Sequence, residues 1–392
     1  MGKKNVAYIN GEMLKWAREQ TPFLSTDMVE LEKPKISSSN LSKWENGEDY
    51  PSITEAKALA SLYRVPFACF YLSEIPPKKP RLYYDRRTER LGTSVYDDIS
   101  YALWSEIQRI MSDRDSILEW ADVDYPEAVL PSVSNESVVD TAKTIREYFE
   151  MSTPLKSKSA YGSNPFSYYR NIIERKNIIV SQISGVSTSE MKGISLSFDE
   201  YPIIGINNQD FDNAKVFSLF HEIAHIFRRS SSLCLIDFDE KNDAEEKICD
   251  SIAAEVLMPR TDFIKIAREI KGVSSKWDPY LIEKLGGRFG VSSVSVLIRL
   301  REVSLVSKID YLTLSKELED NFNNNKALIE RKRKEREFKV KYQYVYLNQH
   351  GYLFPKTIFN AYSSGKITMG EMCRILNVKS KHISGIEQAV MY

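Results

Sequence analysis

The sequence predicts a mainly α fold with a small β-sheet (α+β), built from more than one compact part. Apolar residues recur at helical spacing along most of the chain, whereas short β-branched or alternating segments fall between residues 178 and 206. The composition, 42% apolar and 28% charged residues, is that of an ordinary globular protein. A chain of 392 residues exceeds what one core usually holds, so we expect two or three units.

The N-terminal residues, about 10–75, predict a set of short helices. Residues 37–40 offer N-cap side chains to one of these helices, and Gly47 ends it. Residues 76–80, Pro-Pro-Lys-Lys-Pro, break the helical pattern. We therefore place the end of a first domain, residues 1–78, at this break.

The remainder of the chain predicts a long helix, three strands and a series of further helices. The long amphipathic helix is expected at residues 95–122, and the strands at residues 178–180, 194–198 and 202–206. The other helices are expected near residues 136–150, 166–176, 211–229, 243–257, 261–271, 279–289, 292–303 and 312–340, with a short helical pair near 366–376. The resulting division is a linker with the long helix (79–135), a central domain (136–310), and a charged helix with a C-terminal extension (311–392).

The charge and the cysteine content exclude several classes of protein. Lys plus Arg and Asp plus Glu both number 54, which argues against a protein that coats nucleic acid through bulk charge. Four cysteines without a CxxC pair supply no disulfide framework and suit a reducing compartment. The sequence lacks an apolar signal core and any run of about 18 apolar residues, so we expect a cytoplasmic protein with no membrane partner.

Two of the four histidines, His221 and His225, lie four residues apart, with Glu222 directly after the first. On a helix, positions i and i+4 share one face, so both imidazoles can bind one metal ion. Glu222 lies one residue around the helix, where its carboxylate can take a proton from water activated by zinc. This pattern predicts a hydrolytic zinc site, and its alternative is a chance occurrence of HExxH without a metal.

A third ligand is expected on the helical segment 245–255. Glu246 is the first candidate and Glu245 its nearest competitor, while an exposed acidic face without a metal is the alternative. Asp250, four residues after Glu246, can orient a ligand histidine. Cys249 can in principle bind zinc, but its flanking isoleucines favour a packing role. Two histidines and one glutamate leave a fourth position open for water, as a hydrolytic site requires.

Residues 193–260 resemble the ImmA/IrrE family of bacterial and phage metallopeptidases. Three segments carry the resemblance: the strand 201–207, the helix 217–225 and the segment 246–259. The last of these ends in Leu-Met-Pro, as the glutamate helix of the family typically does. The resemblance covers more than the histidine motif, because the helix-rich residues before and after it also fit.

This resemblance implies a zincin-like metallopeptidase domain. Carried over residue by residue, it implies zinc ligands at His221, His225 and Glu246 and a catalytic base at Glu222. It also implies that the strand near residues 202–207 holds an extended peptide by β-addition, which would set the scissile carbonyl over the zinc.

The N-terminal segment resembles a phage-repressor-like (Cro/XRE) helix-turn-helix domain. The order of residues 14–18, 36–47 and 60–66 carries this resemblance, which implies that Leu41 and Trp44 pack in the core. The residues expected to face a DNA groove are Ser37, Ser38, Ser39, Asn40 and Lys43. Residues 1–80 carry 11 basic and 10 acidic side chains, so a protein-docking or dimerisation module is the alternative.

Together these features predict a zinc-dependent regulatory endopeptidase with a DNA-binding head. The resemblance implies a protein substrate, a repressor of the helix-turn-helix type, whose cleavage controls stress-response or mobile-element genes. Double-stranded DNA is the other expected partner, and a homodimer is left open. The alternative function is a DNA-binding, antitoxin-like regulator in which the metallopeptidase fold serves as a sensor or scaffold. An intact Glu222 weighs against that alternative, because a scaffold has no need of a catalytic base.

Overall fold

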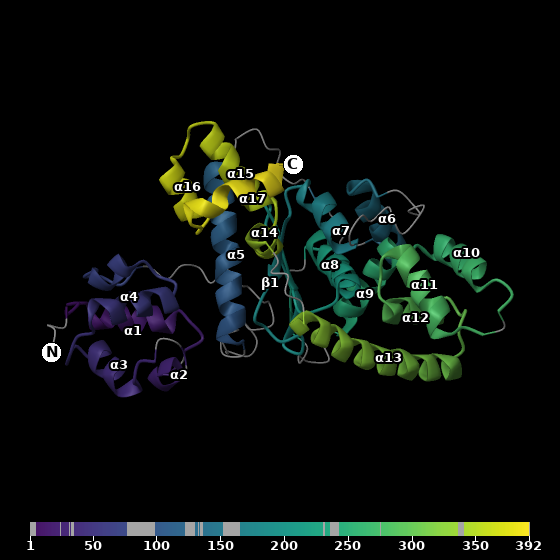
Figure 1. The fold of residues 1–392 in the computed structure, drawn as a ribbon, viewed down its shortest axis with the longest axis horizontal. Coiled ribbons are helices and arrows are strands. Elements are labelled where there is room, and N and C mark those ends of the chain that lie inside the picture. Colours follow the sequence, from purple (N-terminus) through teal and green to yellow (C-terminus); the bar gives the residue numbers. More distant parts are fainter. Residues whose placement is uncertain are drawn as a thin grey trace. The chain divides into compact units, whose positions relative to one another are not determined.

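The computed structural model describes residues 5–23, 25–30, 32, 35–76, 99–121, 130–131, 133, 136–151, 165–229, 232–235, 243–274, 276–335 and 341–391. The chain divides into two compact units, Met1–Met111 and Ser112–Tyr392, and the division falls inside helix α5 (Tyr101–Trp120). The domain boundaries expected at residues 78, 135 and 310 stay predictions. The fold class is confirmed, because helices dominate both units and the strands form one small sheet (Figure 1).

The first unit consists mainly of short helices, as the sequence predicts. These are α1 (Gly11–Glu19), α2 (Thr26–Glu30), α3 (Ser38–Glu45), α4 (Ile53–Leu62) and the 3-10 helix η1 (Phe67–Tyr71). Ser37 caps α3, since its hydroxyl accepts the backbone N–H of Asn40 at 3.3 Å. Ser52 and Glu55 form a reciprocal capping box at the start of α4. These caps explain where both helices begin.

Helices α1 and α3 pack backbone to backbone in this unit. A Cβ built on Gly11 of α1 would lie 2.6 Å from the carbonyl oxygen of Trp44, so only glycine permits this approach. Arg18 of α1 is nearly buried and donates two hydrogen bonds to the Glu45 carboxylate, at 2.7 and 3.0 Å. Leu41 and Trp44 are buried in the core, where the sequence places them. The packing holds the outer side of α3 toward solvent.

The second unit is built on a four-stranded sheet in the order β1-β3-β2-β4. Strand β1 (Ile179–Ile183) runs parallel to β3 (Ile203–Asn207). Strand β2 (Met191–Leu196) is antiparallel to β3 on one side and to β4 (Ser232–Leu235) on the other. The sequence predicts the first three strands within a few residues, but it does not predict β4.

The expectation that residues 202–207 hold a substrate peptide by β-addition is wrong. Strand β3 pairs with β1 along its whole length and with β2 from Ile203 to Ile206. Both of its edges are therefore already used for ladder hydrogen bonds. Another strand can be added only at an end of the sheet, where β1 and β4 lie.

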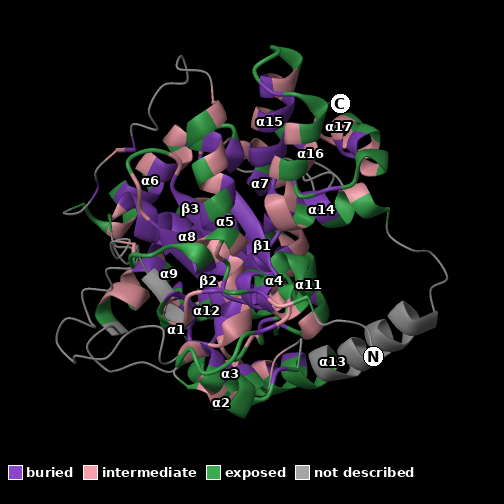
Figure 2. Cartoon of the chain, turned by 90° about the vertical axis from the view of Figure 1, so that its left-hand side faces the viewer, coloured by how far each residue is buried: buried purple, intermediate pink, exposed green. Residues whose placement is uncertain are grey.

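Helix α8 (Asp212–Phe227) packs on β2 and β3, and α9 (Asp243–Leu257) packs on α8. Their contact lies in the main hydrophobic core, and Figure 2 colours the sheet and α8 largely as buried. The other helices of this part are α6 (Val138–Tyr148), α7 (Pro165–Glu174), α10 (Arg260–Lys271), α11 (Pro279–Phe289), α12 (Ser293–Glu302) and α13 (Lys308–Glu335). Each begins and ends within a few residues of its predicted position.

The C-terminal extension contains more helices than the single short pair that the sequence predicts. They are α14 (Tyr342–His350), α15 (Leu353–Ser363), α16 (Met369–Ile375), the 3-10 helix η5 (Ser380–His382) and α17 (Ile383–Met391). Helix α14 packs against β1, so the extension is part of the second unit. Among the described residues, no helix is both long and apolar enough to cross a membrane.

A buried polar cluster joins the turn after α14 to the sheet. Arg170 of α7 is 2% exposed and donates to the carbonyl oxygen of Val180 at 2.7 Å. The Glu174 carboxylate accepts the backbone N–H of Tyr352 at 3.1 Å. Burial raises the pKa of Glu174, and Arg170 partly offsets this effect. Gly351 has φ +80° and lies against Glu174, so a Cβ there would collide with the carboxylate.

We expect Gly351→Ala to destabilise the protein more than Gly365→Ala. Both glycines have positive φ, +80° and +73°, but the space around Gly365 is open. The backbone strain alone costs about 1 kcal/mol, and the collision with Glu174 should bring the loss at Gly351 to about 3 kcal/mol. Urea unfolding of both variants measures the difference in the free energy of unfolding. Equal losses would contradict the close packing at Gly351.

Candidate metal centre

Helix α8 directs two imidazoles to one point. Its residues Leu219, Ile223 and Ile226 are fully buried, which sets the rotation of the helix on the sheet. His221 and His225 lie one turn apart, and their Nε2 atoms are 3.1 Å apart. The side chain of His225 is 1% exposed and that of His221 is 12% exposed. The site is therefore open to solvent mainly on the His221 side.

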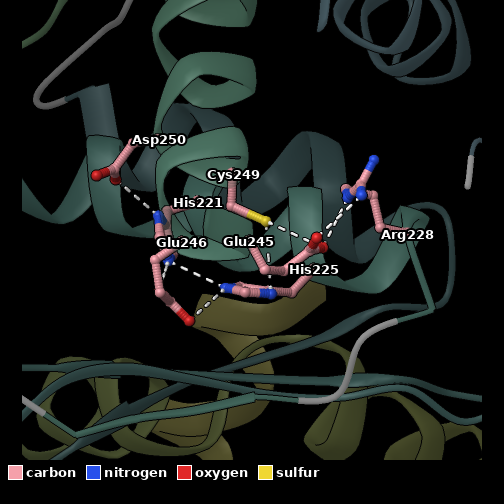
Figure 3. Close-up of polar contacts among 7 residues, drawn as sticks. All are labelled: His221, His225, Arg228, Glu245, Glu246, Cys249 and Asp250. Atoms are coloured by element: carbon pink, nitrogen blue, oxygen red, sulfur yellow. Dashed lines mark hydrogen bonds and ion pairs between the residues drawn. The ribbon is translucent and has the colours of Figure 1, made fainter. Parts of the chain in front are cut away.

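Glu246 of α9 joins the two imidazoles (Figure 3). Its Oε2 lies 3.0 Å from Nε2 of His221, and its Oε1 lies 3.6 Å from Nε2 of His225. Burial by itself raises the pKa of Glu246, but hydrogen bonds with His221 and His225 outweigh burial and hold that pKa well below its ordinary value. The carboxylate therefore stays ionised, as a metal ligand must be.

These three groups have the spacing that one zinc ion requires. Their ligand atoms all lie within 4.8 Å of one another. Zinc bonds of about 2.1 Å in a tetrahedron place ligand atoms about 3.4 Å apart. The separations of 3.0 and 3.6 Å between imidazole nitrogens and Glu246 oxygens are close to that value. Two imidazoles and one carboxylate are also the donor set of hydrolytic zinc sites, so the residues fit the ion.

Asp250, on the next turn of α9, lies on the far side of His221. Its Oδ1 is 2.9 Å from Nδ1 of His221. An imidazole that donates its Nδ1–H to a carboxylate presents the lone pair of Nε2 to a metal. The structure thus brings Asp250 into the position that sequence reasoning assigned to it.

Glu245 and Cys249, the two alternative ligands, lie on the other side of His225 (Figure 3). Arg228 binds both carboxylate oxygens of Glu245, at 2.7 and 2.9 Å. The Sγ atom of Cys249 is fully buried and lies 3.5 Å from Nδ1 of His225. Burial raises the pKa of this thiol. His225, Glu245 and Cys249 are also close enough to hold a metal ion, but they surround Nδ1 rather than Nε2.

Glu222 lies between the two histidines on α8 and is 1% exposed. A Cβ built on Gly193 of β2 would lie 2.5 Å from Oε1 of Glu222. Glycine at this position therefore leaves the space that the carboxylate occupies. The register between β2 and β4 also shifts between Met191 and Gly193, and such irregularities are common beside active sites.

In the first unit, the residues expected to face DNA lie on α3: residues 37–40 at its start and Lys43 in its last turn. Ser37 is the N-cap, and the backbone N–H of Ser38 donates to a glutamate carboxylate of α2 at 3.0 Å. Ser39, Asn40 and Lys43 are exposed. The apolar residues of α3 face the core, so these three side chains form the outer face of the helix.

Sequence reasoning did not identify the role of Gly193 or the pairing of Arg228 with Glu245. Gly193 lies one residue before the predicted strand 194–198. An isolated glycine in or beside a strand is a known signal of close approach by another group. Arg228 and Glu245 are 17 residues apart and have no shared sequence pattern. Only the packing of α9 on α8 brings them together.

Two family models match the chain. Residues 182–301 match the IrrE N-terminal-like domain, which is a peptidase family, and residues 35–68 match a helix-turn-helix domain. The comparisons find no matching curated protein and no matching solved structure. The HExxH motif and Glu246 fall inside the first match, and the start of α3 falls inside the second. Residues 182–301 therefore form a domain of the IrrE-like peptidase family, joined to an N-terminal helix-turn-helix domain.

Proposed function

We propose that the chain is a zinc-dependent regulatory endopeptidase with a DNA-binding head. The observation that carries this proposal is the meeting of two Nε2 atoms and one ionised carboxylate at a single point. Its protein substrate would be a repressor of the helix-turn-helix type, whose cleavage releases stress-response or mobile-element genes. The fused helix-turn-helix domain supports this proposal, because it could bring the peptidase to an operator or to a partner of similar fold.

In this proposal, His221, His225 and Glu246 hold the zinc ion. The bound ion supplies a Lewis acid that polarises the scissile carbonyl and lowers the pKa of water to about 7. Glu222 accepts the proton of the attacking water and passes it to the leaving amine. The burial of Glu222 beside the backbone of β2 restricts its carboxylate to few positions, so little reorganisation is needed during the reaction.

The substrate strand is best placed at β4, an end strand of the sheet. Cys234 of β4 is the register partner of Gly193, whose backbone lies against the Glu222 carboxylate. A peptide added to β4 would therefore run near the proposed base. Strand β1, at the other end, packs against α14. These observations favour β4 over β1 for β-addition.

The exposed face of α3 is the proposed DNA-contacting surface. Lys43 can neutralise a phosphate, and the amide of Asn40 can form paired hydrogen bonds with an adenine edge in the major groove. The hydroxyls of Ser37, Ser38 and Ser39 can contact phosphates close to the helix N-terminus. The small net charge of the first unit predicts modest affinity with a shallow salt dependence.

Two variants test the proposed zinc chemistry. We expect His221→Ala to lose most of its bound zinc, because one of three ligands is removed, and metal analysis of the purified protein measures this loss. Glu222→Gln should keep its zinc but lose cleavage by at least about 100-fold, because the amide cannot accept the proton. Cleavage is measured by mass spectrometry of new N-termini in helix-turn-helix repressors of the host. Undiminished zinc in the first variant, or undiminished cleavage in the second, contradicts the assignment.

Replacement of Gly193 tests whether Glu222 can adopt its position only when residue 193 has no side chain. Gly193→Ala puts a Cβ where Oε1 now lies, so the carboxylate must move by several tenths of an ångström or more. We expect a fall of about 100-fold in kcat with unchanged zinc content. Gly370→Ala is the control, because an added Cβ there makes only an ordinary contact of 3.9 Å with the Thr368 hydroxyl oxygen. An active Gly193→Ala enzyme would show that Glu222 needs no such room.

Alanine substitutions on α3 test the DNA-contacting surface. Lys43→Ala should weaken binding to duplexes selected from a random pool, and it should reduce the salt slope by about one. Asn40→Ala should cost about 1–3 kcal/mol and relax sequence preference. Lys15→Ala is the matched control, because Lys15 is exposed on α1 and the same charge is lost. Equal effects of Lys43→Ala and Lys15→Ala would favour a protein-docking role for α3.

A further inference from the structure

The inner side of His225 faces a thiol rather than a carboxylate. Its Nε2 lies 3.1 Å from Nε2 of His221 and 3.6 Å from a carboxylate oxygen of Glu246. Its Nδ1 lies 3.5 Å from Sγ of Cys249. Both His225 and Cys249 are essentially inaccessible to bulk solvent, so this contact between Nδ1 and Sγ lies inside the core.

The arrangement sets the direction of each hydrogen bond. If Nε2 of His225 offers its lone pair to a metal, Nδ1 carries the proton and donates it to Sγ. The thiol hydrogen of Cys249 then points to Oε1 of Glu245, 4.0 Å from Sγ. Glu245 is in turn held by the two hydrogen bonds from Arg228, at 2.7 and 2.9 Å. In this series of contacts, the Nδ1–H of His225 and the thiol of Cys249 each have an acceptor.

We propose that Cys249 is a positioning residue for the zinc site, which fixes the tautomer and ring orientation of His225. Cys249 would accept the Nδ1–H of His225, as Asp250 accepts the Nδ1–H of His221. The Nδ1 atom of His221 lies 2.9 Å from Oδ1 of Asp250. This inference rests on the proposed zinc site. It replaces the interpretation that Cys249 only fills space between apolar neighbours.

The same geometry argues against Cys249 as a zinc ligand. The two ring nitrogens of an imidazole point in diverging directions, so one ion cannot bind both. Cys249 lies on the Nδ1 side, whereas Glu246 and His221 meet at Nε2. A metal bound on the Cys249 side would also have to displace Arg228 from Glu245.

Two substitutions separate hydrogen bonding from packing at this position. Cys249→Ser keeps an acceptor for Nδ1–H but is smaller, whereas Cys249→Val keeps the apolar volume and removes the acceptor. We expect zinc affinity, measured by competition with a chromogenic chelator, to fall about 10–100-fold in Cys249→Val and less than about threefold in Cys249→Ser. Cys373→Val is the control, because this partly exposed cysteine lies in the C-terminal extension.

Cobalt substitution of the wild type distinguishes a positioning residue from a ligand. We expect the Co²⁺ protein to lack the near-ultraviolet charge-transfer band of a thiolate ligand. The presence of that band would overturn the proposal in favour of ligation. Wild-type affinity in Cys249→Val, together with weaker zinc binding in Cys249→Ser, would overturn it in favour of packing.

A measurement on the imidazole ring separates this inference from the proposed function. In the zinc-loaded protein, the Nδ1–H proton of His225 should resonate at the downfield ¹H position of a hydrogen-bonded proton in the wild type and in Cys249→Ser, and it should move upfield in Cys249→Val, where the acceptor is removed. If the wild type shows this pattern but cleaves no helix-turn-helix repressor, the proposed function fails while the role of Cys249 stands. If the proton resonates at the same position in all three proteins, the role of Cys249 is excluded.

Discussion

The packing of α9 on α8 is the contact on which the candidate metal centre depends. Two of the grouped side chains belong to α8 and the third to α9, so their meeting requires both a fixed distance and a fixed rotation between the helices. The buried apolar residues of each helix supply this constraint. Ile252 and Val256 of α9 and Ile223 of α8 are fully buried in the same core. A small rotation of α9 would carry Glu246 away from the imidazoles, because neighbouring helix residues point about 100° apart.

Polar side chains near this contact are paired with one another. Arg228 binds Glu245, and Asp250 accepts from one histidine while a thiol faces the other. Arg228 and Glu245 are partly exposed and Asp250 is exposed, so these pairings orient the side chains more than they offset a cost of burial. Far from the centre, Arg170 and Glu174 are buried, and there an unpaired charge would cost several kcal/mol. Arg170 binds a carbonyl oxygen of β1 and Glu174 binds a backbone N–H after α14, which anchors the C-terminal helices to the sheet.

Most helices could be predicted from local patterns, because a buried face repeats every three or four residues. The predicted segments 243–257, 261–271, 279–289 and 292–303 agree with the observed helices to within a residue at most ends. The strands were harder to predict. Strand β4 has only four residues, Ser-Leu-Cys-Leu, and its assignment depends on pairing with β2. The order of the strands in the sheet could not be predicted either, since the apolar run of β3 suits an inner strand and an edge strand equally well.

The sequence by itself determined which residue types form the centre: two histidines one helical turn apart, a glutamate beside the first, and a second acidic helix downstream. It could not determine which acidic residue turns toward the imidazoles. Glu245 and Glu246 are adjacent, and only the rotation of α9 directs one to Arg228 and the other to His221. The tertiary structure also decided that Gly193 adjoins Glu222 and that Cys249 adjoins His225. These are contacts between separate elements, and such contacts depend on packing rather than on local periodicity.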